Sequence, residues 1–178
     1  SDNPRFDQIE NLNTLKFSAE NLLALINDIL DYSKIDAGKL VFEEADFDLK
    51  DRINSIVQVL KVKADEKGIR VESFVDPALP DFLTGDPTRL NQILFNIAGN
   101  AVKFTHQGEV KLNVTLVRKW EKEVEIRFEV SDTGIGISPD HLETIFESFS
   151  QAGLDITRKY GGTGLGLAVV WGTVKDHQ

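Results

Sequence analysis

The first forty residues carry an apolar stripe with helical spacing. Its positions step by four and three residues from Leu15 to Ser33, and polar residues fill the intervals. This spacing predicts a helix from Asp7 to Lys39, with Gly38 as its stop signal. The stripe consists of Leu15, Ala19, Leu22, Ile26, Ile29 and Ser33, and it is widened by Leu12, Leu23, Leu25 and Leu30. A lone helix has no core of its own, so the pattern favours a bundle or coiled coil, the alternative being a helix that lies on its own domain.

The pattern changes after this helix, which indicates a domain boundary within residues 39–48. A short strand and a lead-in are suggested by the apolar positions Leu40, Phe42, Phe47 and Leu49. Helical spacing over 51–67 predicts a second helix, and the run at 69–75 predicts a strand. Asp86 followed by Pro87 combines an N-cap with proline at the first helical position, so a third helix begins there and runs to about Phe104.

Two later segments alternate strictly between apolar and polar residues. Residues 110–116 and 124–130 both have period 2, which predicts two strands with one wet face each, joined as a hairpin by the polar turn 121–123. Ser138-Pro139 predicts a short helix, and residues 165–170 begin a final apolar helix. The expected fold class is therefore α+β, a two-layer sandwich of helices on one face of a mixed or antiparallel sheet, behind an N-terminal bundle helix.

Charge narrows the range of partners. The chain of 178 residues has a net charge of −9, which opposes binding to nucleic acid or to an anionic membrane surface. It contains no cysteine, and therefore no disulfide, thiol nucleophile or zinc–thiolate site. No apolar stretch approaches the roughly 18 residues that a membrane-spanning helix requires. An anionic ligand would need a local pocket of backbone N–H groups, lysine or Mg²⁺.

Two glycine-containing segments could approach such a ligand. Asp132–Ile137, with the sequence Asp-Thr-Gly-Ile-Gly-Ile, directly follows a predicted strand, and its aspartate can accept a hydrogen bond from an exocyclic amine. Taken alone, this segment fits an ordinary tight turn with a solvated aspartate better than a ligand site. Gly161–Leu167 holds four glycines in front of an apolar helix, an arrangement of N–H donors that suits phosphate oxygens. It lacks the Lys-Ser or Lys-Thr of a P-loop and the strand–helix–strand setting of a Rossmann fingerprint.

The helix that begins at Asp86 carries further polar groups. Asn96 and Asn100 are four residues apart and share a face, with Lys103 on the next turn. Buried amides need hydrogen-bond partners, and an amide oxygen is an acceptable ligand for Mg²⁺ when phosphates and waters supply the rest. The alternative is that both asparagines bond only to neighbouring backbone.

The helix with Asn96 and Asn100, the segment Asp132–Ile137 and the segment Gly161–Leu167 follow one another in this order. Together they resemble the ATP-binding domain of sensor histidine kinases, within the group shared with DNA gyrase, Hsp90 and MutL. The resemblance extends from Asn11 to Val170. Residues 96–105 look like the N box of that family, 132–137 like its first glycine box, 145–149 like its F box and 161–167 like its second glycine box. Residues 22–38 are similar to the second helix of the dimerisation domain. The resemblance implies a Bergerat-type ATP-binding fold.

The same resemblance implies roles for individual residues. Asp132 would bind the adenine amine, Asn100 would hold Mg²⁺ and Lys103 would contact phosphate as a catalytic residue together with Asn96. Residues 149–160 would form an ATP lid in which Arg158 and Lys159 contact the γ-phosphate. The remaining residues expected to bind ATP are Phe104, Gly134, Gly136, Ile137, Gly162, Thr163, Gly164, Leu165, Gly166 and Leu167.

Asn96 distinguishes two kinds of enzyme within that group. The ATPase relatives carry a glutamate at this position to activate water, and an amide cannot act as a general base. The residue therefore favours direct phosphoryl transfer to a histidine over ATP hydrolysis of the gyrase or Hsp90 type. None of His106, His141 and His177 has the acidic flank and helical setting of an acceptor. A non-catalytic module for dimerisation or partner docking, with a vestigial nucleotide site, is the alternative.

The resemblance also implies an organisation and partners. Residues 1–40 would be the second helix of a dimerisation domain whose first helix, with the acceptor histidine, is not in this chain. Residues 41–178 would be the catalytic domain without the last two strands that the family pattern leads one to expect. The expected partners are ATP, a response regulator or receiver domain, and a second copy through the N-terminal helix in the full-length protein. We expect a cytoplasmic fragment that touches neither nucleic acid nor membrane.

Overall fold

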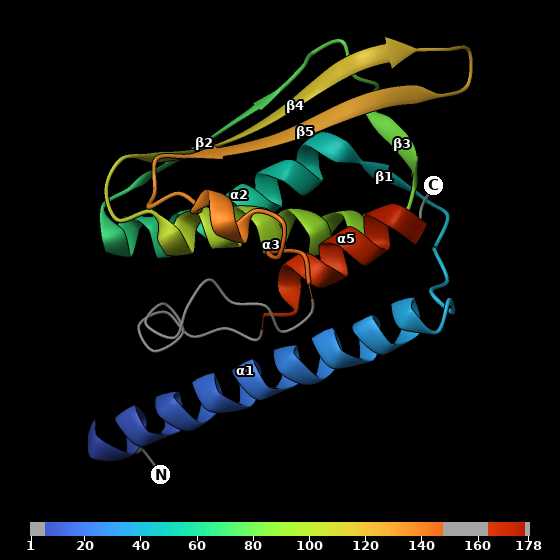
Figure 1. Cartoon of the computed structure of the whole chain (residues 1–178). Helices are drawn as coiled ribbons and strands as arrows, with labels where there is room; N and C mark the ends of the chain where they lie inside the picture. The colour runs from blue at the N-terminus through green and yellow to red at the C-terminus, as the bar shows by residue number, and fades with distance from the viewer. Residues whose placement is uncertain (1–5, 148–163, 177–178) are drawn as a thin grey trace, which may run out of the picture.

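The computed structural model describes residues 6–147 and 164–176 (Figure 1). A three-stranded mixed sheet has the order β2-β4-β5, with β2 (Arg70–Val75) parallel to β4 (Glu109–Lys119) and β4 antiparallel to β5 (Val124–Asp132). Two helices, α2 (Leu49–Lys67) and α3 (Pro87–Phe104), cover one face of this sheet. The expected α+β sandwich with a mixed sheet is therefore confirmed.

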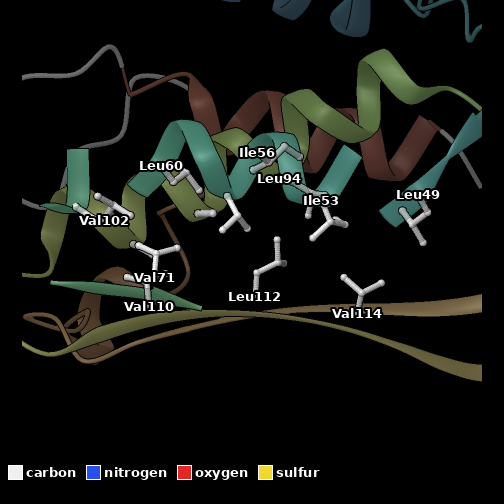
Figure 2. Close-up of a cluster of buried hydrophobic side chains, with 14 of the residues drawn as sticks. Leu49, Ile53, Ile56, Leu60, Val71, Leu94, Val102, Val110, Leu112 and Val114 are labelled. Atoms are coloured by element: carbon white, nitrogen blue, oxygen red, sulfur yellow. The ribbon is translucent and has the colours of Figure 1, made fainter. Parts of the chain in front are cut away.

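The core lies between this sheet and the two helices (Figure 2). In β4 the alternate residues Val110, Leu112 and Val114 point toward the helices and are at most 2% exposed, which confirms the predicted alternation. The helices contribute residues spaced by three and four, as expected for apolar faces of amphipathic helices. The main contributors are Ile53, Ile56 and Leu60 of α2, Leu94, Ala98 and Val102 of α3, and Val110, Leu112 and Val114 of β4.

An aspartate caps the N-terminus of each core helix. Asp48 accepts a hydrogen bond from the N–H of Asp51 at 2.9 Å at the start of α2. Asp86 accepts one from the N–H of Arg89 at 2.8 Å, with Pro87 at the first position of α3, so the predicted helix start is confirmed. The second carboxylate oxygen of Asp86 accepts from the N–H of Glu43 at 2.9 Å, which ties the preceding segment to the same helix end.

Several elements differ from the sequence expectation. The first strand, β1 (Ala45–Asp48), excludes Leu40 and Phe42, and Leu49 is already the first residue of α2, because the Asp48 cap starts the helix there. A partner strand, β3 (Phe82–Gly85), pairs antiparallel with β1 and was not expected, because its four residues carry too short a pattern. The last helix, α5 (Gly166–Asp176), begins one residue later than expected and continues beyond Val170. The short helix after Ser138 is a single 3₁₀ turn, Pro139–His141.

The N-terminal helix α1 (Phe6–Asp36) lies apart from the sheet and packs its C-terminal part against α5 (Figure 1). It ends in a Schellman motif, in which Gly38 has φ 60° and its N–H donates to the Ile35 carbonyl at 2.9 Å, while the N–H of Lys39 donates to the Lys34 carbonyl at 2.8 Å. Apolar side chains of the predicted stripe are 42–66% exposed at Leu12, Leu15, Leu22, Leu23, Ile26, Ile29 and Leu30.

Two features join α1 to the rest of the chain. The Asp31 carboxylate lies 3.0 Å from the Arg89 guanidinium and accepts a hydrogen bond from the Gln92 amide at 2.7 Å, so that α1 is bonded to α3. Gly172 of α5 lies against Ile35, where a Cβ would be 2.5 Å from Cγ2 of the isoleucine. Only a glycine lets the two helices approach this closely at that point.

Candidate functional site

The polar face of α3 meets the start of α5. Asn96, Asn100 and Lys103 are all half-buried along one side of α3. The side-chain amide of Asn96 donates a hydrogen bond to the carbonyl of Gly166 at 3.3 Å, although the two residues are 70 positions apart. A Cβ on Gly166 would lie 3.4 Å from the Asn96 amide oxygen, so the helices are in close contact there. The structure thus brings the asparagine-rich helix and the second glycine segment together.

The turn after β5 is fastened to the end of α3. The carboxylate of Asp132 accepts a hydrogen bond from the N–H of Gly134 at 2.8 Å. The N–H of Ile135 donates to the Phe104 carbonyl at 3.3 Å, and a Cβ on Gly134 would stand 2.7 Å from that carbonyl oxygen. A side chain at this position would therefore push the turn away from the helix. Gly136 has φ 68°, a left-handed conformation, and the turn exposes Asp132 itself.

A threonine braces the other side of the same turn. The Thr133 hydroxyl accepts a hydrogen bond from the N–H of Glu109 at 3.0 Å and lies 3.2 Å from the carbonyl oxygen of Gln107. Gly108 has φ 106°, and a Cβ on it would collide with the Thr133 hydroxyl oxygen. The turn is thereby held against the start of β4 as well as against α3. Sequence reasoning missed Thr133, because a threonine between an aspartate and a glycine carries no signal for a distant partner.

A lysine outside all the predicted motifs closes the end of α3. Lys67, the last residue of α2, donates from its ammonium group to three backbone carbonyls at 2.8, 2.7 and 3.4 Å, which belong to Val102, Lys103 and Thr105. Sequence reasoning did not single out Lys67. Its only signal is a basic residue in the last turn of a helix, which ordinarily indicates a favourable interaction with that helix's own dipole.

Lys103 provides positive charge beside this turn. Its ammonium nitrogen lies 5.1 Å from the centre of the Phe104 ring, within range of a cation–π interaction. Partial burial lowers the pKa of Lys103, and the positive charge of Lys67 lowers it further. A nearby anion would act in the opposite direction and favour the charged form of Lys103.

The second glycine segment is described only from its third glycine onward. Gly164 has φ 69°, Leu165 is fully buried, and Gly166 and Leu167 are half-buried at the start of α5. The predicted ligand residues Arg158, Gly162 and Thr163 lie outside the described residues, as do Lys159 and the whole predicted lid 149–160.

The described residues hold neither an acidic or histidine metal cluster nor a helix of membrane-spanning character. Within residues 6–147 and 164–176, no group of three or more His, Cys, Asp or Glu is placed to hold a metal ion. None of the helices in the described part of the chain has the length and apolar character needed to cross a membrane. Of the histidines, His106 is exposed just after α3 and His141 is in the 3₁₀ turn, while His177 lies outside the described residues.

Known proteins resemble this chain in sequence and in fold. Residues 85–178, more than half of the chain, match the family described as histidine kinase-, DNA gyrase B-, and HSP90-like ATPase. The chain is 45% identical over 158 residues to hybrid signal transduction histidine kinase L of Dictyostelium discoideum, a match that covers 89% of this chain and 9% of that protein.

Solved structures agree with the sequence match. Full-length ShkA in complex with AMPPNP is 33% identical with a TM-score of 0.77, over 98% of this chain and 35% of that one. The histidine kinase ThkA in complex with the response regulator protein TrrA is 25% identical with a TM-score of 0.56, over 89% of this chain and 45% of that one.

The chain spans 9% of the length of the Dictyostelium kinase and 18% of the length of the signal transduction histidine-protein kinase BarA of Escherichia coli. The family match covers α3, the turn after β5 and α5, which are the elements that the hydrogen bonds of Asn96 and Phe104 bring together. The chain therefore belongs to the histidine kinase-, DNA gyrase B-, and HSP90-like ATPase family, as a relative of the sensor histidine kinases.

Proposed function

We propose that the chain binds Mg-ATP on the surface formed by α3, the Asp132–Ile137 turn and the start of α5. The observation that carries this proposal is the hydrogen bond between Asn96 and the Gly166 carbonyl, which places an amide-bearing helix beside a glycine-rich helix start. Such a start offers backbone N–H donors and the positive end of a helix dipole to phosphate oxygens. The complex of the related ShkA with AMPPNP supports a nucleotide as the ligand.

Each end of the nucleotide has candidate partners in this site. The exposed carboxylate of Asp132 is suited to accept a hydrogen bond from the adenine amine, because the hydrogen bond that it accepts from the Gly134 N–H fixes its orientation. Phe104 supplies an aromatic face near the turn, and Lys103, which touches that ring, supplies charge for the phosphates. Gly134, Gly136 and Ile137 form the backbone against which the base would lie, while Gly164, Leu165, Gly166 and Leu167 form the phosphate end.

The donor set fits a magnesium ion held mainly by the nucleotide. No cluster of acidic or histidine side chains lies in the described residues, so the protein offers amide oxygens, with Asn100 as the candidate ligand. Mg²⁺ typically keeps several waters and shares phosphate oxygens with few protein groups. When bound, the ion would neutralise phosphate charge. Asn100 and Lys103 lie on the same side of α3, so both would face the phosphates.

For the reaction, we propose transfer of the γ-phosphoryl group to a histidine of a dimerisation domain, and from there to an aspartate of a response regulator. Asn96 is an amide and cannot take a proton from water, so the site positions the phosphoryl donor rather than activating a hydrolytic water. The family match and the histidine kinase relatives support this choice. The complex of ThkA with TrrA supports a response regulator as partner.

We further propose that residues 1–40 belong to the dimerisation domain and residues 41–178 to the catalytic domain. The exposed leucines and isoleucines of α1 support this division, because a monomer leaves them in water. In the full-length protein they would pack in a bundle with a second copy. The proposal places this unit in the cytoplasm, where ATP and response regulators are available.

Isothermal titration of the chain with ATP and Mg²⁺ tests the nucleotide site. We expect Asp132→Asn to weaken binding about tenfold, because a charged acceptor is replaced by a neutral one of the same shape. Asp140→Asn is the matched control, because Asp140 is exposed in the nearby 3₁₀ turn and its substitution also removes one negative charge. Absence of ATP binding in the unmodified chain, or equal affinities for the two variants, would contradict the proposal.

Phosphoryl transfer is tested in the full-length parent protein with radiolabelled ATP. We expect acid-labile phosphohistidine that is lost in an Asn100→Ala variant. Steady release of phosphate without phosphoprotein would indicate an ATPase instead. ATP binding without either product would indicate the non-catalytic docking module.

A further inference from the structure

The end of α3 has an unusual set of hydrogen-bond donors. The last carbonyls of a helix have no donors within the helix and must find them elsewhere. The Phe104 carbonyl accepts from the N–H of Ile135, in the turn that carries Asp132. Three other carbonyls, of Val102, Lys103 and Thr105, accept from one side chain, Lys67 of α2. A single ammonium group and a single backbone N–H thus complete the end of the helix.

Lys67 is held in place by the way α2 ends. Gly68 is left-handed with φ 67°, its N–H donates to the Asp65 carbonyl at 3.1 Å, and the N–H of Ile69 donates to the Ala64 carbonyl at 3.1 Å. This is a Schellman motif, and the buried side chains of Ala64 and Ile69 anchor it in the core. An ammonium group has three N–H donors, which equals the number of carbonyls in reach. The lysine is therefore both fixed at its base and fully engaged at its tip.

The residues that Lys67 holds are those on which the nucleotide site depends. Lys103 is one of the three residues whose carbonyls it binds, and Phe104 lies between two of them. The Phe104 carbonyl in turn sets the position of Gly134, which approaches it too closely to carry a side chain. A shift of the last turn of α3 would therefore move the phosphate-side lysine and the adenine-side turn together.

We propose that Lys67 is a positioning residue for the nucleotide: through three carbonyls it holds the last turn of α3, and with it Lys103 and the Asp132–Ile137 turn, in the geometry that binds ATP. This inference rests on the proposed ATP site. Lys67 acts through the backbone and touches neither base nor phosphate.

The first test compares two lysines of α2 by titration with ATP and Mg²⁺. We expect Lys67→Ala to weaken ATP binding roughly tenfold, because it leaves carbonyls without their charged donor and loosens the turn. Lys63→Ala is the matched control, because Lys63 is exposed one turn earlier and its loss changes the net charge equally. We expect the affinity of this control to stay within about twofold. Should Lys67→Ala fail to fold, Lys67→Gln takes its place.

The second test restores the ammonium group chemically. The chain has no cysteine, so Lys67→Cys creates a single alkylation site. Reaction with 2-bromoethylamine gives a side chain of lysine length with a terminal ammonium, whereas iodoacetamide gives a neutral amide. We expect the aminoethylated protein to recover ATP affinity to within about threefold of the unmodified chain and the carbamidomethylated protein to remain weak.

These outcomes separate the inference from the function on which it rests. If the unmodified chain does not bind ATP, the nucleotide site itself is wrong. If it binds, but Lys67→Ala and Lys63→Ala have equal affinity, only the positioning role is wrong. A lower melting temperature of Lys67→Ala with unchanged ATP affinity would overturn the inference too, because it would reduce Lys67 to a structural helix cap.

Discussion

The chain makes two kinds of contact between helices and the rest of the molecule, and they differ in chemistry. Helices α2 and α3 meet the sheet through apolar side chains that are almost entirely buried, such as Ile53, Leu94 and Leu112, which are at most 2% exposed. Among the described side chains, helix α1 contacts α3 through the ion pair of Asp31 with Arg89, whose side chains are 16% exposed. It contacts α5 through the close approach of Gly172 to Ile35. Most of the described apolar surface of α1 remains in water.

The difference indicates that the contacts of α2 and α3 with the sheet form as part of folding, whereas the contacts of α1 can separate and form again. Separating α2 or α3 from the sheet would expose a continuous apolar core, so these elements unfold together. Among the described side chains, separating α1 would break the ion pair and the hydrogen bond of Asp31 and the close approach of Gly172 to Ile35. The proposed nucleotide site rests mainly on the first kind of contact, because Asn96, Phe104, Lys67 and the turn after β5 belong to the core unit. Helix α5 joins this unit through the hydrogen bond of Asn96 to the Gly166 carbonyl.

The largest expected effect comes from truncating a core residue. Leu94→Ala removes a side chain that is 2% exposed and should lower the free energy of unfolding by about 2–5 kcal/mol, because a cavity remains between α3 and the sheet. Leu22→Ala, on exposed α1, is the control and should change it by less than about 0.5 kcal/mol. Denaturant unfolding followed by circular dichroism measures both. Equal destabilisation would mean that α1 is as much a part of the core as α3.

A smaller effect is expected at the contact of α1 with α3. Asp31→Ala leaves the Arg89 guanidinium without its carboxylate and should cost roughly 1–2 kcal/mol, between the values for exposed and buried pairs. The loss should appear as faster hydrogen exchange at the C-terminal end of α1, with α2 and the sheet unchanged. Asp81→Ala, an exposed aspartate of equal charge, is the control. Faster exchange throughout the sheet would show that the contact supports the core after all.

The smallest effect is expected where charges pair without burial. A hydrogen bond from Lys111 is the main cause that lowers the pKa of Glu109, and the charges of Lys111 and Arg70 add to it. Because the folded pKa lies below the unfolded one, Glu109 stabilises the fold above its ordinary pKa and loses this contribution as the pH falls through the folded pKa. In Lys111→Gln we expect the pKa of Glu109 to rise toward its ordinary value, measured by NMR titration of the carboxyl carbon. An unchanged pKa would assign the shift to another cause.

Much of the core unit could be predicted from local patterns. The alternation in β4 and β5 and the Asp86-Pro87 start of α3 were confirmed because each is encoded by adjacent residues. The four-residue strands β1 and β3 form only through a pairing of 45–48 with 82–85, which no local pattern indicates. Their lengths are too short for periodicity to distinguish a strand from a loop.

Local sequence patterns likewise predict only part of the candidate site. The spacing of Asn96 and Asn100 predicted a shared face of one helix, and the glycine segments predicted close backbone approaches. Lys67 could not be predicted, because its role depends on where the end of α2 lies relative to the end of α3. Helix pattern determines which side of α2 faces the core. It does not determine which distant carbonyls the last side chain reaches.

The bond between Asp86 and the N–H of Glu43 has a kinematic consequence. It binds Glu43 to the start of α3, while the N–H of Lys39 is bound to the end of α1, so the two hydrogen bonds are separated by four residues of chain. Four peptide steps span at most about 14 Å. Any movement of the rest of the described structure relative to α1 is therefore limited to what this short connection allows.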